Sequence, residues 1–120
     1  MIDENVNLRV QKGADESWDL EFINEKTDIA IDITGYTVYF TVKSKISDTD
    51  DEAVIKKDIT SHTVPTSGKT KIIVTSTDTN ISPDNYIFDV SLKTNLGEIT
   101  KGIIQGIFTV EEPINQRANE

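Results

Sequence analysis

The stretch that decides the fold is YTVYFTVK, which runs from Tyr36 to Lys43. Large apolar residues occupy every second position, and mostly polar residues fill the positions between them. Successive side chains of a β-strand point to opposite faces, so this period of two predicts a strand with one buried and one exposed face. A second stretch, YIFDVSLK from Tyr86 to Lys93, repeats the pattern.

Shorter alternating or apolar stretches extend along most of the chain, separated by polar turns. The further predicted strands cover residues 6–11, 18–23, 29–33, 53–59, 70–76 and 98–110. Residues 53–59 also fit a short helical turn, because Glu52 and Lys56 are four residues apart, but the run is too short for a stable helix and a strand is favoured. Gly102 and Gly106 predict a bend or bulge in the last strand, which would allow it to serve two sheets.

Seven or eight short strands joined by turns, with no sustained helical period, predict an all-β fold. The spacing favours an antiparallel two-sheet sandwich of immunoglobulin-like type, with a small closed barrel as the alternative. A chain of 120 residues is expected to form one domain. We expect the β-sandwich domain to cover residues 5–111, between a flexible N-terminus at 1–4 and a polar C-terminal tail at 112–120.

The charge balance is acidic, with 12 basic and 21 acidic residues and a net charge of −9. Binding to nucleic acid or to an anionic membrane surface depends on lysine and arginine, so both are disfavoured. The absence of cysteine excludes disulfides. The opening MIDENVNLRV lacks the basic and apolar regions of a signal peptide, and no apolar run approaches the ~20 residues of a membrane span. We therefore expect a protein made in the cytoplasm.

Residues suited to catalysis are sparse. The single histidine, His62, lies in a polar loop and is interpreted as a solvated residue rather than a catalytic base. The tripeptide GKT at 68–70 resembles the end of a phosphate-binding loop, but Thr63 stands where that loop has its first glycine, so a turn is predicted.

Trp18 is interpreted as a core residue, with a ligand-stacking platform as the alternative. Asp19 and Glu21 share one face of a strand, but no second carboxylate cluster is set against them, as glycoside hydrolysis would require. They are therefore interpreted as a solvent-facing strand edge.

An acidic loop provides the one candidate cation site. Its carboxylates belong to Asp48, Asp50, Asp51 and Glu52, and hard cations prefer such oxygen ligands. A helix-flanked calcium loop needs glycine at its sixth position, where this chain has Ala53, so a solvated loop is favoured over weak calcium binding. The sequence predicts no catalytic, cofactor-binding or metal-binding residue, and no enzyme activity.

Apolar residues on the outward parity of the strands suggest a contact surface. Tyr39 and Ile87 fall on the polar side of the two strongest strands, and with Ile23 and Ile73 they are the candidate partner surface. A covering loop is the alternative. The outward positions of the two strands are Tyr39, Thr41, Lys43, Ile87, Asp89 and Ser91.

Four stretches carry a resemblance to a known family. They are SWDLEF at Ser17–Phe22, DITGYTVYFTVK at Asp32–Lys43, TSTDTNISPDNYIFDVSL at Thr75–Leu92 and GEITKGIIQGIFTV at Gly97–Val110. Together they resemble the immunoglobulin-like N-terminal domain of phage baseplate upper proteins and of small prophage tail proteins. Asn85 stands where the family often has glycine, and asparagine also tolerates a left-handed turn.

The resemblance implies a non-enzymatic structural domain of a phage or prophage tail, located in the virion. Its partners would be other tail or baseplate proteins, or further copies of itself, contacted through sheet edges and loop ends. The alternative is a carbohydrate-binding accessory module for attachment to the host surface. That alternative predicts an exposed aromatic residue in a shallow groove, and Tyr39 is the candidate.

Overall fold

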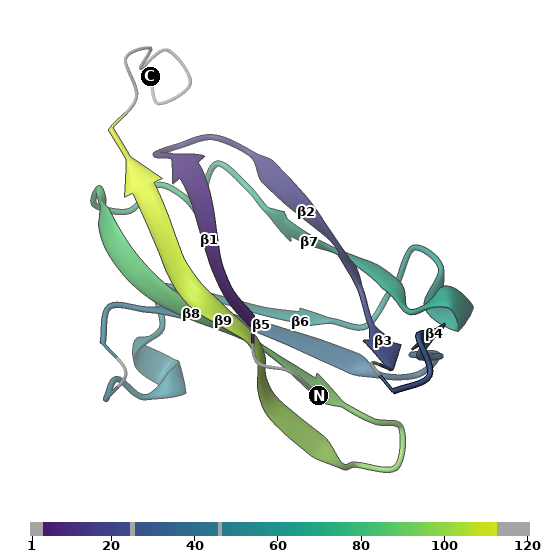
Figure 1. Ribbon diagram of the computed structural model, residues 1–120. Helices are drawn as coiled ribbons and strands as arrows, with labels where there is room; N and C mark the ends of the chain where they lie inside the picture. The colour runs from purple at the N-terminus through teal and green to yellow at the C-terminus, as the bar shows by residue number, and fades with distance from the viewer. Residues whose placement is uncertain (1–3, 25, 46, 113–120) are drawn as a thin grey trace.

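The computed structural model describes residues 4–24, 26–45 and 47–112, and these form an all-β fold (Figure 1). The strands are β1 (Glu4–Gln11), β2 (Glu16–Glu21), β3 (Ile23–Asn24), β4 (Ile29–Ala30), β5 (Thr37–Lys43), β6 (Ile55–Ile59), β7 (Lys69–Val74), β8 (Asp84–Lys93) and β9 (Ile99–Glu111). Two short 3₁₀ turns are η1 (Asp50–Glu52) and η2 (Pro65–Ser67). Of the predicted polar ends, residues 1–3 and 113–120 lie outside the described residues.

The main sheet has the strand order β1-β9-β8-β5-β6. The β9, β8, β5 and β6 neighbours are antiparallel, whereas β1 runs parallel to β9. The prediction of a purely antiparallel arrangement is therefore wrong for this pair. Alternation in the sequence indicates which face of a strand is buried, but it carries no information about the direction of the neighbour across the ladder.

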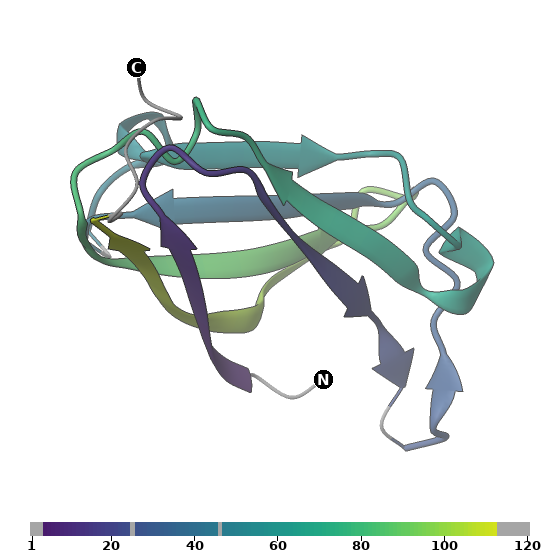
Figure 2. The same ribbon diagram turned by 90° about the horizontal axis from the view of Figure 1, so that it is seen from above.

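A second layer lies across the core from the main sheet. It contains the antiparallel β2–β7 ladder, and β3 and β4 form a separate two-residue hairpin beside it. Figures 1 and 2 show the main sheet curling beneath this narrower layer. The architecture is thus a curled mixed sheet with two small two-stranded ladders.

The core lies between the two layers and is lined by alternate residues of both. In β5 the buried residues are Val38, Phe40 and Val42, as their period of two predicts. The Trp18 ring packs edge-on against the Phe108 ring, with centroids 5.8 Å apart, and at 6.4 Å from the ring of Phe40. Full burial of a side chain such as that of Phe40 or Phe108 stabilises the fold by about 1.5–3 kcal/mol. Trp18 packs against the core, as interpreted from the sequence, but its side chain is only half-buried.

The β8–β9 hairpin contains the predicted irregularity. Its register pairs Val90 with Ile104 but Leu92 with Thr100, so extra residues of β9 are accommodated between these pairs. Such a bulge bends a strand and increases its twist. The last strand stays in the main sheet along its whole length, and the expectation that it serves two sheets is wrong.

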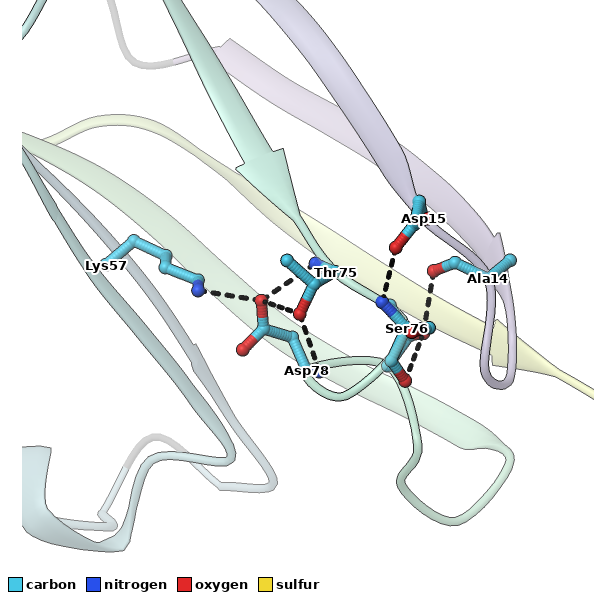
Figure 3. A network of polar contacts seen from close by, with 7 residues as sticks. Ala14, Asp15, Lys57, Thr75, Ser76 and Asp78 are labelled. Atoms are coloured by element: carbon cyan, nitrogen blue, oxygen red, sulfur yellow. Dashed lines mark hydrogen bonds and ion pairs between the residues drawn. The ribbon is translucent and has the colours of Figure 1, made fainter. Parts of the chain in front are cut away.

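A polar network closes one end of the two layers (Figure 3). The Asp78 carboxylate accepts a hydrogen bond from the Thr75 amide at 2.8 Å and lies 2.7 Å from the Lys57 ammonium. The Ser76 amide donates to the Asp15 carboxylate at 2.6 Å. These contacts tie β6, the turn after β7 and the turn before β2 together. Within the described ranges, no helix is long and apolar enough to cross a membrane.

Candidate contact surface

The outward face of the main sheet forms a groove of about 840 Å³. Antiparallel pairing of β5 with β8 places Tyr39 opposite Ser91, Thr41 opposite Asp89, and Lys43 opposite Ile87. All six outward positions singled out in the sequence line this groove. They share one surface because residues two apart on a strand point to the same face, and the ladder places equivalent residues side by side.

Neighbouring strands extend the groove on both sides. From β9, Ile107 lies opposite Ile87 and Gln105 lies opposite Asp89. From β6, Lys56 and Asp58 pair with Thr41 and Tyr39. Ile99, located past the bulge near the hairpin tip, lines the same groove. The surface therefore combines an apolar pair, Ile107 and Ile87, at one end with a polar row next to it and Tyr39 in the row beyond.

The polar groups of the groove take part in local contacts. The Ser91 hydroxyl donates to the Asp89 carboxylate at 3.4 Å, and the Lys43 ammonium donates to the backbone carbonyl of Asp48 at 3.0 Å. The groove is lined by two lysines and two aspartates, so its formal charge balances. Among its described lining residues there is neither histidine nor cysteine. The arrangement suits contact with a surface of mixed polarity.

The four residues of the predicted partner surface fall into two groups. Tyr39 and Ile87 both line the groove, although the row of Thr41 and Asp89 separates them, whereas Ile73 and Ile23 lie outside the main sheet. Ile73 is 57% exposed and points away from the core between the buried Ile72 and Val74, and Ile23 is 41% exposed in β3. Alternation shows that a residue faces outward from its own strand, but not which layer that strand joins.

The structure adds Ile107 and Ile99 to the exposed apolar residues of the groove, at 43% and 53% exposure. The sequence pattern of β9 contains a signal for Ile107, because it has the opposite parity to the buried Phe108 and Val110. Ile99 has the same parity as Ile107, and it pairs with Lys93 beyond the bulge.

His62 is a structural bridge and not the solvated loop residue expected from the sequence. Its Nε2 lies 2.8 Å from the Tyr36 carbonyl oxygen, and its Nδ1 lies 2.9 Å from the hydroxyl oxygen of the fully buried Thr70. A carbonyl oxygen only accepts hydrogen bonds, so Nε2 donates to Tyr36. The polar composition of this loop contains no indication that its backbone folds over β7.

Carboxylates of the acidic loop cap local turns. Glu52 accepts hydrogen bonds from the Thr49 amide and hydroxyl at 2.8 and 3.1 Å, and these bonds lower the pKa of Glu52. Asp48 accepts a bond from the Lys45 amide at 3.1 Å. Among the described residues there is no group of three or more histidine, cysteine or acidic side chains arranged to hold a metal ion.

No protein-family model matches the chain, and no curated protein sequence matches it. The functional argument therefore depends on the chain's own residues and on the structure.

Proposed function

We propose that this protein is a non-enzymatic structural domain of a phage or prophage tail, of baseplate type, which acts by binding other tail proteins or further copies of itself. The observation that carries the proposal is the groove on the outward face of the main sheet. The exposed Ile107 and the half-buried Ile87 lie side by side in it, and Tyr39 lies further along the same face, beyond the polar row of Thr41 and Asp89. Protein interfaces commonly combine an apolar, aromatic-rich centre with a polar rim.

The proposal includes an immunoglobulin-like sandwich as the finer description of the fold. In variable-type domains the sheet with strands C′, C, F and G faces a sheet that includes B and E. The order β6-β5-β8-β9, with β2 and β7 in the other layer, supports this assignment. The Tyr86 hydroxyl donates to the Ser82 carbonyl at 2.6 Å, and burial raises the pKa of this tyrosine. A tyrosine near the start of strand F bonded to upstream backbone is a hallmark of such domains.

Co-expression with the products of neighbouring genes tests the proposal. If those genes encode tail proteins, we expect a stable complex by size-exclusion chromatography. Replacing Ile87→Lys places a charge next to Ile107 in the groove and should weaken the complex at least tenfold, or about 1.4 kcal/mol. The matched control is Ile73→Lys, an exposed substitution on the other layer, which should leave the complex intact.

Two results would contradict the tail role. One is a gene neighbourhood devoted to polysaccharide degradation. The other is a protein that remains monomeric and binds no tail protein, both as wild type and as the Ile87→Lys variant. Loss of the complex with Ile73→Lys but not with Ile87→Lys would show that the partner binds the layer that contains Ile73.

The second candidate function is carbohydrate binding, and one observation favours it. Tyr39 lies in the groove next to Asp58 and Thr41, which pairs an aromatic ring with hydrogen-bonding groups. Calorimetry with host-surface oligosaccharides would distinguish the two functions. Sugar binding that is lost with Tyr39→Ala and kept with Tyr39→Phe would favour this candidate over the tail role.

A further inference from the structure

A second cleft, of about 250 Å³, opens between β1 and β2. Figure 2 shows these two strands diverging from their shared turn, with β7 on the far side of β2. The apolar residues that line the cleft come from both layers and are Leu8, Trp18, Leu20, Ile72, Phe88, Val90 and Ile104. Trp18 and Leu20 are only half-buried there, although they point toward the core.

Two strands bordering the cleft have an edge without a ladder partner. Among the described strands, β2 pairs only with β7, and β1 is an outer strand of the main sheet that pairs only with β9. At the start of β2 the Ser17 amide donates a hydrogen bond of 3.2 Å to the side-chain carboxylate of the preceding residue, Glu16. An edge of this kind presents backbone donors and acceptors that another extended chain can pair with.

The cleft has a definite charge. Asp19 and Glu21 are among its lining residues, and the described lining includes no lysine or arginine. Across the ladder with β7, Asp19 lies opposite Lys71, with a charge separation of 3.8 Å, and Glu21 lies opposite Lys69, while the Asp19 side chain stays 84% exposed. The groove on the main sheet differs, because its lysines and aspartates balance. On the free edge of β2, which faces away from Lys69 and Lys71, the two carboxylates therefore favour a basic neighbour over an acidic one.

We propose that this cleft binds an extended segment of a partner protein, with alternating apolar and basic side chains, as an additional strand on the free edge of β2. The parity of β2 fits such a strand, since Trp18 and Leu20 point inward while Asp19 and Glu21 point outward. Side chains of an added strand alternate in the same way, so its apolar residues would contact the inward pair and its basic residues the outward pair. The inference depends on the proposed role in protein contact but uses a different surface.

A synthetic peptide of sequence TVKVRVTVK is a suitable probe. Trp18 is the single tryptophan of the chain and lines the cleft, so its fluorescence reports on occupancy directly. We expect a saturable change in Trp18 emission with this basic peptide and at least tenfold weaker binding of the acidic counterpart TVEVEVTVE. Two versions of the basic peptide, N-methylated at odd or at even residues, test the backbone pairing. Strand addition requires one version to lose binding and the other to keep it.

Substitutions in the cleft test the charge argument. The double variant Asp19→Asn/Glu21→Gln keeps side-chain size and should weaken the basic peptide at least tenfold while removing the preference over the acidic one. The matched control is Asp51→Asn/Glu98→Gln, which makes the same charge change at exposed sites outside the cleft lining and should bind as wild type does.

Several results would overturn the proposal. They are the absence of a saturable change with any peptide up to about 1 mM, equal binding of basic and acidic peptides, or equal effects of both methylated versions. A concentration-dependent change in Trp18 emission without peptide would assign the cleft to a second copy of the chain instead. The Ile87→Lys variant should bind the basic peptide normally, so failure of the tail-complex experiment and failure of this one are separate results.

Discussion

At the residue scale, Gly68 shows how closely the loops approach the second layer. It has a φ of +70° after η2, and its carbonyl accepts a hydrogen bond from the Phe22 amide at 2.9 Å. A Cβ atom at this position would lie 2.5 Å from the Phe22 carbonyl oxygen and 2.7 Å from that of Ile31. Glycine is therefore required both by its left-handed conformation and by the lack of space.

Replacing Gly68→Ala should lower the free energy of unfolding by about 2–4 kcal/mol, because backbone strain and the contact with two carbonyl oxygens add. Urea denaturation measures this loss. Gly97→Ala is the matched control, since Gly97 also has a positive φ but a Cβ atom there would meet nothing within 4 Å. It should cost only about 1 kcal/mol. Equal losses in the two variants would show that the close approach at Gly68 contributes nothing.

At the element scale, β6 is an outer strand of the main sheet and carries a lysine on its inward parity. Lys57 lies between Ile55 and Ile59 in the alternation, and its ammonium is paired with Asp78 at 2.7 Å. An inward-pointing charge on an edge strand opposes pairing with another chain. The same ion pair connects the edge of the main sheet to the turn after β7.

The Asp78 pair predicts a pH-dependent stability. Burial opposes ionisation of Asp78, but Lys57 and the Thr75 amide outweigh it, so its pKa lies below the ordinary 3.8. A lowered folded-state pKa contributes stability above the unfolded value, and this contribution is lost as the pH falls through the folded value. The free energy of unfolding of wild type should exceed that of Asp78→Asn by about 1 kcal/mol near pH 7, and the difference should shrink below pH 3.8.

Urea unfolding of the two proteins at a series of pH values provides the measurement. Asp58→Asn is the control, because it removes an exposed carboxylate from the outward face of the same strand as Lys57. A stability difference between wild type and Asp78→Asn that stays constant, or grows, as the solution becomes acidic would refute the role of the ion pair.

The elements that the sequence predicted best are those with the longest alternation. Strand β5 starts one residue later than predicted, and β8 covers the whole predicted stretch. The predicted strand at 29–33 is reduced to Ile29–Ala30, because the Ile31 amide bonds to the Phe22 carbonyl and the Ile33 amide bonds to the Pro65 carbonyl. Such long-range backbone partners leave no local pattern. The same limit explains why the sequence did not show that Ile23 and Ile73 lie outside the sheet that carries Tyr39 and Ile87.

At the scale of the whole molecule, the acidic charge and the exposed apolar groove act against each other. A net charge of −9 makes copies of the chain repel one another in neutral solution, and the isoelectric point expected from the sequence is about 4.5. Self-repulsion disappears near that pH, and exposed apolar surface is then free to associate. The hairpin tip adds Leu96, which is 85% exposed.

Light scattering should therefore show a larger mean particle mass at pH 4.5 than in neutral solution. If the groove mediates this association, Ile87→Lys should reduce it more than Ile73→Lys, although both variants change the charge equally. Equal reduction by the two variants would indicate association through charge alone, and a constant particle mass across this range would contradict the role of the apolar groove.

The parallel pairing of β1 with β9 has a mechanical consequence. Glu4 lies beside Ile104 and Gln11 lies beside Glu111, so the chain enters this ladder at one end and leaves it at the other. A pull on the two ends would slide the strands along each other and load the hydrogen bonds along all eight residues of β1 together, rather than opening them one after another. If the domain is tethered at both ends, the β1–β9 ladder would therefore resist the tension between them.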